Sequence, residues 1–113
     1  RNCFAGGHTG GSFLTSNMAF ISTENLIPCL ELLAQIGEVE LDEGIREAFE
    51  GRLIATRYDH NRWYELPIGK LEVTVARDEI GSGLIWFRVQ APHECGRAVE
   101  VVLQACWVYQ LKR

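Results

Sequence analysis

The residues best placed to do chemistry are His93 and Cys95. A cysteine nucleophile needs a histidine base beside it, and here the two lie two positions apart. The segment lacks both the H-x-E and P-C-x-x-C spacings of zinc deaminases and the four ligands of a structural zinc site. A zinc site completed by His60 would have to be assembled in space. We interpret the segment as a polar loop, with a small hydrolase or transferase using His93 and Cys95 as an alternative.

Two other patterns do not match known binding motifs. The glycine-rich segment 6–11 fits neither the dinucleotide-binding nor the P-loop fingerprint. Six carboxylates lie between residues 38 and 50, without the spacing of a calcium-binding EF-hand, and they predict a solvated acidic face. We predict no catalytic residue, metal or cofactor. In an alternative interpretation, the chain is an inhibitor or immunity-type protein that masks a basic partner with this acidic face. The residues of the acidic face are Glu38, Glu40, Asp42, Glu43, Glu47 and Glu50.

Aromatic side chains are concentrated in the second half of the chain, and Trp86 is the most informative of them. Strand periodicity places it opposite Ile85 and Phe87, beside Arg88, where a solvated sheet would carry small polar groups. A sheet that is apolar on both faces needs cover on both. The pattern therefore predicts a homodimer interface, a partner site or a ligand cavity, and the predicted binding residues are Trp63, Trp86, Arg88, Trp107 and Tyr109.

Helical spacing of apolar residues is clearest between Leu26 and Ile36. The pattern predicts an amphipathic helix with Asn25 as its N-cap and Gly37 as the left-handed residue that ends it. A short edge strand over residues 18–21 is expected to lead into this helix.

The next segment predicts a second, shorter helix and then a hairpin. Asp42 is the expected N-cap, and Gly51 is expected to end the helix. Residues 53–58 and 62–66 read as two strands joined by a polar turn.

Alternating residues predict two antiparallel strands over 70–77 and 85–91. Valine and aromatic residues favour a long strand over 98–112, although Arg97, Glu100 and Gln104 at helical spacing leave a helix open. The expected fold is α+β, with one main amphipathic helix and a short second one packed on an antiparallel sheet of four to five strands.

Composition limits the protein's class. The 113 residues are 47% hydrophobic, as expected for one globular domain. A net charge of −4 argues against non-specific nucleic-acid binding, and no apolar run reaches the roughly 18–20 residues that span a membrane. The four cysteines lack CxxC spacing, so we interpret them as structural thiols of a cytoplasmic protein.

The chain divides into a glycine-rich segment, residues 1–17, and a single α+β domain, residues 18–113. The first segment starts at Arg1 and reads as a mobile lead-in or as residues left by cloning, with Met18 as a plausible native start. This arrangement resembles small uncharacterised proteins encoded on mobile, integron-type gene cassettes. The resemblance implies an accessory, oligomeric protein and transfers no functional residues. The leading hypothesis is a non-catalytic, homodimeric binding module with an aromatic-lined small-molecule or partner site.

Overall fold

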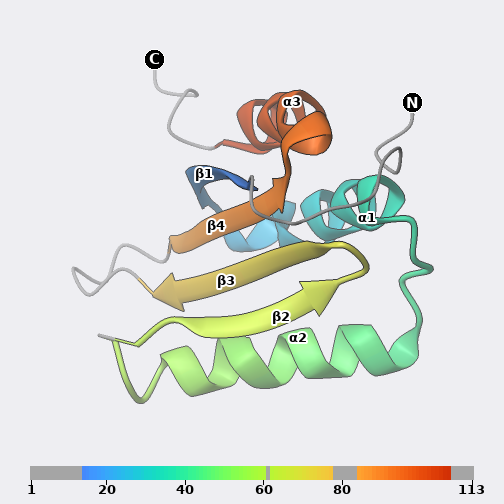
Figure 1. Cartoon of the computed structure of the whole chain (residues 1–113). Helices are drawn as coiled ribbons and strands as arrows, with labels where there is room; N and C mark the ends of the chain where they lie inside the picture. Colours follow the sequence, from blue (N-terminus) through green and yellow to red (C-terminus); the bar gives the residue numbers. More distant parts are fainter. Residues whose placement is uncertain (1–13, 61, 78–83, 108–113) are drawn as a thin grey trace.

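The computed structural model describes residues 14–60, 62–77 and 84–107, which form four strands and three helices (Figure 1). The strands make one antiparallel sheet of order β1-β4-β3-β2, so the expected α+β class with an antiparallel sheet is confirmed. No helix in these ranges has both the length and the apolar character needed to cross a bilayer. In chain order the elements are β1 (Leu14–Ile21), the 3-10 turn η1 (Thr23–Asn25), α1 (Leu26–Gly37), α2 (Glu43–Thr56), β2 (Tyr64–Ile68), β3 (Leu71–Arg77), β4 (Ile85–Pro92), the 3-10 turn η2 (His93–Cys95) and α3 (Gly96–Cys106).

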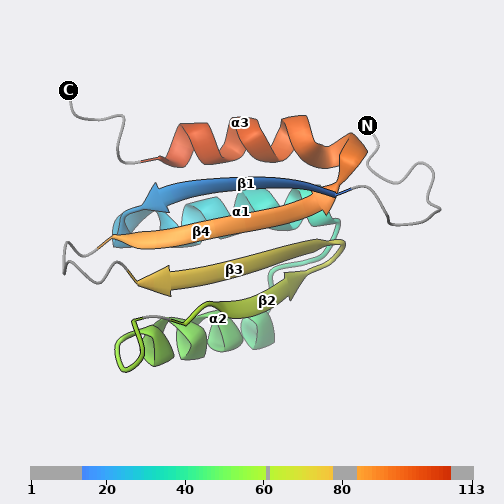
Figure 2. The ribbon, with the colours of Figure 1, turned by 60° about the vertical axis from the view of Figure 1, so that its left-hand side comes forward.

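The two faces of the sheet differ in what covers them. Successive side chains of a strand point to opposite faces, and β4 buries Ile85, Phe87, Val89 and Ala91 completely on one of them. The helices pack on that face: the ring of Phe49 in α2 lies 5.9 Å from that of Phe87, and α3 contributes Val99, Leu103 and Cys106 to the same core. Figures 1 and 2 show α1 behind the sheet, with α3 near β1 and α2 near β2.

Strand β1 confirms the predicted edge strand and extends it towards the N-terminus. It begins at Leu14, so residues 14–17 of the predicted lead-in belong to the sheet and pair with β4. The rest of that segment, residues 1–13, lies outside the described residues.

Helix α1 forms where the apolar spacing predicted it, but both of its ends differ from the prediction. The Asn25 side chain makes no capping bond; its Nδ2 donates instead to the carbonyl oxygen of Cys106, 3.3 Å away. The left-handed residue after the helix is Glu38, with a φ of 62°, not Gly37. Asn25 therefore ties the start of α1 to the end of α3.

Gly37 is required for a different reason, which is the close approach of two backbones. A Cβ at Gly37 would collide with the carbonyl oxygen of Ile68, and a Cβ at Gly69 would collide with the carbonyl of Gly37. Gly69 also has a φ of 62°, a conformation that glycine adopts readily. The N–H of Lys70 donates to the Gly37 carbonyl at 3.4 Å, so the end of α1 is held on the β2–β3 turn.

Helix α2 begins as predicted and runs past its predicted end. Asp42 is the N-cap, its Oδ1 accepting a hydrogen bond of 2.9 Å from the N–H of Ile45. The predicted stop at Gly51 and the predicted strand over 53–58 are wrong. An apolar face continues at helical spacing beyond Gly51, through Ile45, Phe49, Leu53 and Thr56.

The predicted strands over 70–77 and 85–91 are confirmed as β3 and β4. The segment predicted to pair with residues 53–58 instead forms β2, which pairs with β3. Strand β2 is an edge strand and carries Pro67 at an exposed position. Proline has no N–H to donate to a neighbouring strand, and edge strands tolerate it for that reason.

The long strand predicted over 98–112 is wrong, because residues 96–106 form α3. The helix buries residues at four- and three-residue spacing, namely Val99, Leu103 and Cys106, and leaves Val101 50% exposed. The contact of an apolar helix face with the core outweighs the strand preference of the valines. Residues 108–112 lie outside the described residues.

The backbone contact at Gly37 predicts a large difference between two glycine substitutions. We expect Gly37→Ala to lower the free energy of unfolding by about 2 kcal/mol or more, because the backbone of α1 or of the β2–β3 turn must shift. Gly51→Ala is the matched control. Its Cβ would meet no atom within 4 Å, and alanine in a helix interior is more stable than glycine by about 0.5–1 kcal/mol. Urea unfolding of both variants measures the difference, and equal stabilities would contradict the role given to Gly37.

Candidate binding site

The face of the sheet opposite the helices is called here the open face. Among the described residues, no helix lies on it. Cross-strand pairing sets Phe20 beside Trp86 and Met18 beside Arg88. The open face is thereby apolar and aromatic at one end and polar at the other; its residues are Ser16, Met18, Phe20, Glu65, Pro67, Glu72, Thr74, Ala76, Trp86, Arg88 and Gln90, together with Trp63 just before β2.

Three aromatic rings form the apolar end of the open face. The centroids of Phe20 and Trp86 lie 3.7 Å apart, and those of Trp63 and Trp86 lie 6.4 Å apart. Each of these three side chains is half-buried, and the smaller Thr74 and Ala76 of β3 are buried beside them. Aromatic side chains that are partly exposed in a group are typical of binding surfaces.

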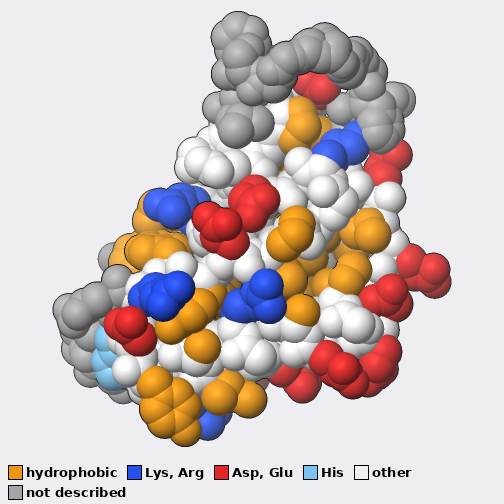
Figure 3. Space-filling model, turned by 60° about the horizontal axis from the view of Figure 1, so that its bottom comes forward, with side chains coloured by type: hydrophobic (Ala, Val, Ile, Leu, Met, Phe, Trp, Pro, Cys, Tyr) orange, Lys and Arg blue, Asp and Glu red, His pale blue; other side chains and the backbone are white. Residues whose placement is uncertain are grey.

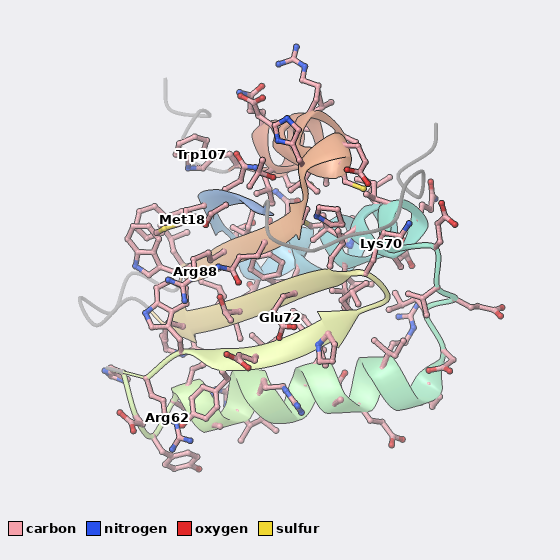
Figure 4. The ribbon with its side chains drawn as sticks, in the orientation of Figure 1. Met18, Arg62, Lys70, Glu72, Arg88 and Trp107 are labelled. Atoms are coloured by element: carbon pink, nitrogen blue, oxygen red, sulfur yellow. The ribbon has the colours of Figure 1, made fainter. Side chains whose placement is uncertain are left out.

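Arg88 is the cation of the open face. Its guanidinium lies 4.7 Å above the centroid of the Trp63 ring, and its Nε is buried without a hydrogen-bond partner. Within the described ranges neither Arg88 nor the half-buried Glu72 takes part in an ion pair. Figure 4 shows Arg88 near Met18, and Glu72 farther along the sheet. Arg88, the one cation among the described residues of the open face, and Glu72, one of its two anions beside Glu65, are therefore left uncompensated by the side chains of that face.

A pocket of about 470 Å³ adjoins the open face between α2 and β2. Arg52 is fixed on its floor, because its Nε donates to the Glu65 carbonyl at 2.6 Å and its Nη1 to the Ala48 carbonyl at 3.3 Å. The guanidinium of Arg62 lies 5.1 Å above the ring centroid of Tyr64. The pocket is lined by Gly51, Arg52, Ala55, Arg62, Trp63, Tyr64 and Glu65.

Charge is unevenly distributed over the surface. Figure 3 shows Asp and Glu side chains gathered mainly at the right-hand end, and Lys and Arg side chains beside hydrophobic ones elsewhere. Of the six carboxylates in the predicted acidic face, Asp42 caps α2 and Glu38 pairs with Lys70 at 3.9 Å. The other four, Glu40, Glu43, Glu47 and Glu50, are exposed.

The structure brings together three of the five predicted binding residues, namely Trp63, Trp86 and Arg88. Trp107 lies elsewhere: it follows α3 and forms a bridge with Ile21 at the β1 edge of the sheet (Figure 4). Tyr109 lies outside the described residues. Two arginines that line the pocket, Arg52 and Arg62, were not among the predicted binding residues. Arg62 could have been predicted from the run Arg62-Trp63-Tyr64, in which a cation precedes two aromatic residues.

His93 and Cys95 do not form a nucleophile–base pair. Both lie in η2, where His93 is exposed and Cys95 is fully buried. Cys95 is also disulfide-bonded, so the prediction that it is a structural thiol is wrong. In the part of the chain that the structure describes, no three His, Cys, Asp or Glu side chains are grouped to hold a metal ion.

The thiols of Cys29 and Cys106 are free and buried, as predicted for them. Burial raises the pKa of Cys29 above its ordinary value of 9.0, and so do the nearby Cys106 and a side-chain hydrogen bond between the two residues. These contacts join α1 to α3 in the core.

The raised pKa of Cys29 predicts that its thiol reacts slowly with thiol reagents in the folded protein, because the thiolate is the reacting form. At pH 8 we expect maleimide to label Cys29 far more slowly in buffer than in urea, as followed by peptide mass spectrometry. The pKa of Cys29 is higher in the folded than in the unfolded state. Its contribution to the free energy of unfolding is therefore complete below about pH 9 and declines above it. Equal labelling rates with and without urea would contradict this environment.

We compared the chain with protein-family models, with curated proteins and with solved structures, and none of them matches it.

Proposed function

We propose that this chain is a non-catalytic binding module that forms a homodimer through the open face and binds its ligand beside that face. One observation carries the proposal: the rings of Phe20, Trp86 and Trp63 lie, next to Arg88, on a sheet face that no helix of the described residues covers. Apolar surface of this kind is usually covered by a partner.

A second copy of the chain is the occupant that fits the charges of the open face. Arg88 needs an anion, because a half-buried guanidinium without a carboxylate loses hydration and gains no ion pair. Glu72, on the adjacent strand, needs a cation. In a twofold dimer every contact occurs twice, so Arg88 of each protomer can pair with Glu72 of its partner. The rings around Arg88 would then exclude water from the interface.

A charge swap tests this dimer. We expect the wild-type protein to have twice the 12.8 kDa chain mass in size-exclusion chromatography with light scattering. Arg88→Glu and Glu72→Arg should each weaken the dimer by about tenfold or more, because each places like charges opposite one another. The double variant restores opposite charges and should restore the dimer.

Arg57→Glu is the matched control, since Arg57 is an exposed arginine at the C-terminal end of α2. It should leave the mass unchanged, and circular dichroism should show that all four variants are folded. A monomeric wild-type protein at about 100 µM would refute the dimer, on the affinities expected for a stable interface. A double variant that stays monomeric would refute the Arg88–Glu72 pairing.

A second candidate function rests on the exposed carboxylates of α2. Glu43, Glu47 and Glu50 recur at four- and three-residue spacing and so share one face of the helix. With Glu40 they make an acidic surface without ion pairs among the described residues. Such a surface suits an inhibitor or immunity-type protein that covers a basic partner.

Charge reversal distinguishes this second function from the first. If the acidic surface binds a basic protein, a Glu40→Lys, Glu43→Lys, Glu47→Lys variant should lose the capture of that protein from a lysate of the source cells, because like charges then face each other. The Arg88→Glu variant should capture it normally. A partner captured equally by both variants would exclude the acidic surface as its binding site.

A further inference from the structure

We infer that the pocket between α2 and β2 binds a small planar anion, with Arg62 and Arg52 contacting the anionic group and Trp63 and Tyr64 contacting the ring. The inference rests on the proposed function, since it names the chemical class of the module's ligand. The volume of the pocket, about 470 Å³, is within the range of small-molecule sites.

Three arginines lie in or beside the pocket. Arg52 donates to two backbone carbonyls, Arg62 lies over Tyr64, and Arg88 lies over the other lining aromatic, Trp63. None of the three arginines forms an ion pair with a described residue. Among the described residues, Glu65 is the one carboxylate that lines the pocket, so positive charge predominates there in a chain whose net charge is −4.

Arg62 presents accessible donors to the pocket. Its guanidinium carbon lies 5.1 Å from the centroid of the Tyr64 ring, and its side chain is exposed. An exposed guanidinium can donate two parallel hydrogen bonds to a carboxylate or phosphate. Hydrogen bonds to the backbone hold Arg52 in place, so little side-chain entropy is lost when it contacts an anion.

The pocket has open space beside α2. A Cβ added to Gly51 would meet no atom within 4 Å, so the helix presents bare backbone to the pocket. Trp63 and Tyr64 also line the pocket and provide aromatic surface. A flat ring bound beside Gly51 can contact this surface, and apolar contact with Trp63 would add to the binding of its charged group.

Phosphate and carboxylate share the chemistry that this site would recognise, and two probes distinguish them. Adenosine 5′-monophosphate carries a phosphate and indole-3-acetate a carboxylate, each attached to a flat ring system. Adenosine and indole are their neutral counterparts. Titrations of the ¹⁵N-labelled protein, followed by NMR, should show saturable shifts of the Trp63 indole N–H and the Gly51 amide with at least one anion. The matching neutral compound should bind about tenfold more weakly or worse.

Variants of the pocket complete the test. Arg62→Gln should weaken binding of the anion about tenfold or more, whereas Arg57→Gln, an exposed arginine outside the pocket, should not. Gly51→Leu should block binding while leaving the fold intact, because its side chain enters open space. Absence of shifts with both anions, equal binding of the neutral compounds, or unchanged binding by Arg62→Gln would each overturn the inference.

The proposed dimer and the proposed ligand site can be refuted separately. A protein that is monomeric by light scattering and still binds one of the anions retains the ligand site and loses the dimer. A dimer that binds neither anion retains its interface and loses the ligand site.

Discussion

The backbone contact between Gly37 and the β2–β3 turn fixes the position of α1, and α3 packs against α1. At its C-terminal end the helix backbone lies directly on the backbone of the β2–β3 turn, because Gly37 and Gly69 have no side chains to separate them. At its N-terminal end the Asn25 side chain holds the last turn of α3. With α1 attached at both ends, α3 packs towards β1 and α2 towards β2, and all three helices cover one face of the sheet. Among the described residues, this arrangement leaves the opposite face without a helix.

Trp63 connects the two parts of the proposed function. Its ring neighbours Trp86 on the open face and carries the guanidinium of Arg88, and it also lines the pocket beside α2. In the proposed dimer, the partner therefore lies close to the ligand site. A ligand that moves the Trp63 ring would also change the support of Arg88, so occupancy of the pocket and strength of the dimer would be thermodynamically linked.

The strand alternation around Trp86 could be predicted from the sequence because the buried residues Ile85, Phe87 and Val89 fix its period. The ends of α2 and the identity of α3 could not. Their local preferences favour strands, and the helices depend on faces buried by distant parts of the chain. The errors in the site have the same origin. Arg52 lies between the predicted helix end at Gly51 and the predicted strand over 53–58, and it is found within α2 beside β2. Trp107 was predicted to lie on a strand face that does not form.

Pro67 limits how this sheet can associate with other sheets. An edge strand with regularly spaced N–H groups can accept a further strand, and repeated addition leads to fibrils. In β2 that hydrogen-bonding pattern is interrupted at Pro67, where no N–H exists to donate. At the other edge, Trp107 already bridges Ile21. The protein can thus present an aromatic sheet face to a partner while one of its edges resists the strand-by-strand growth that leads to amyloid.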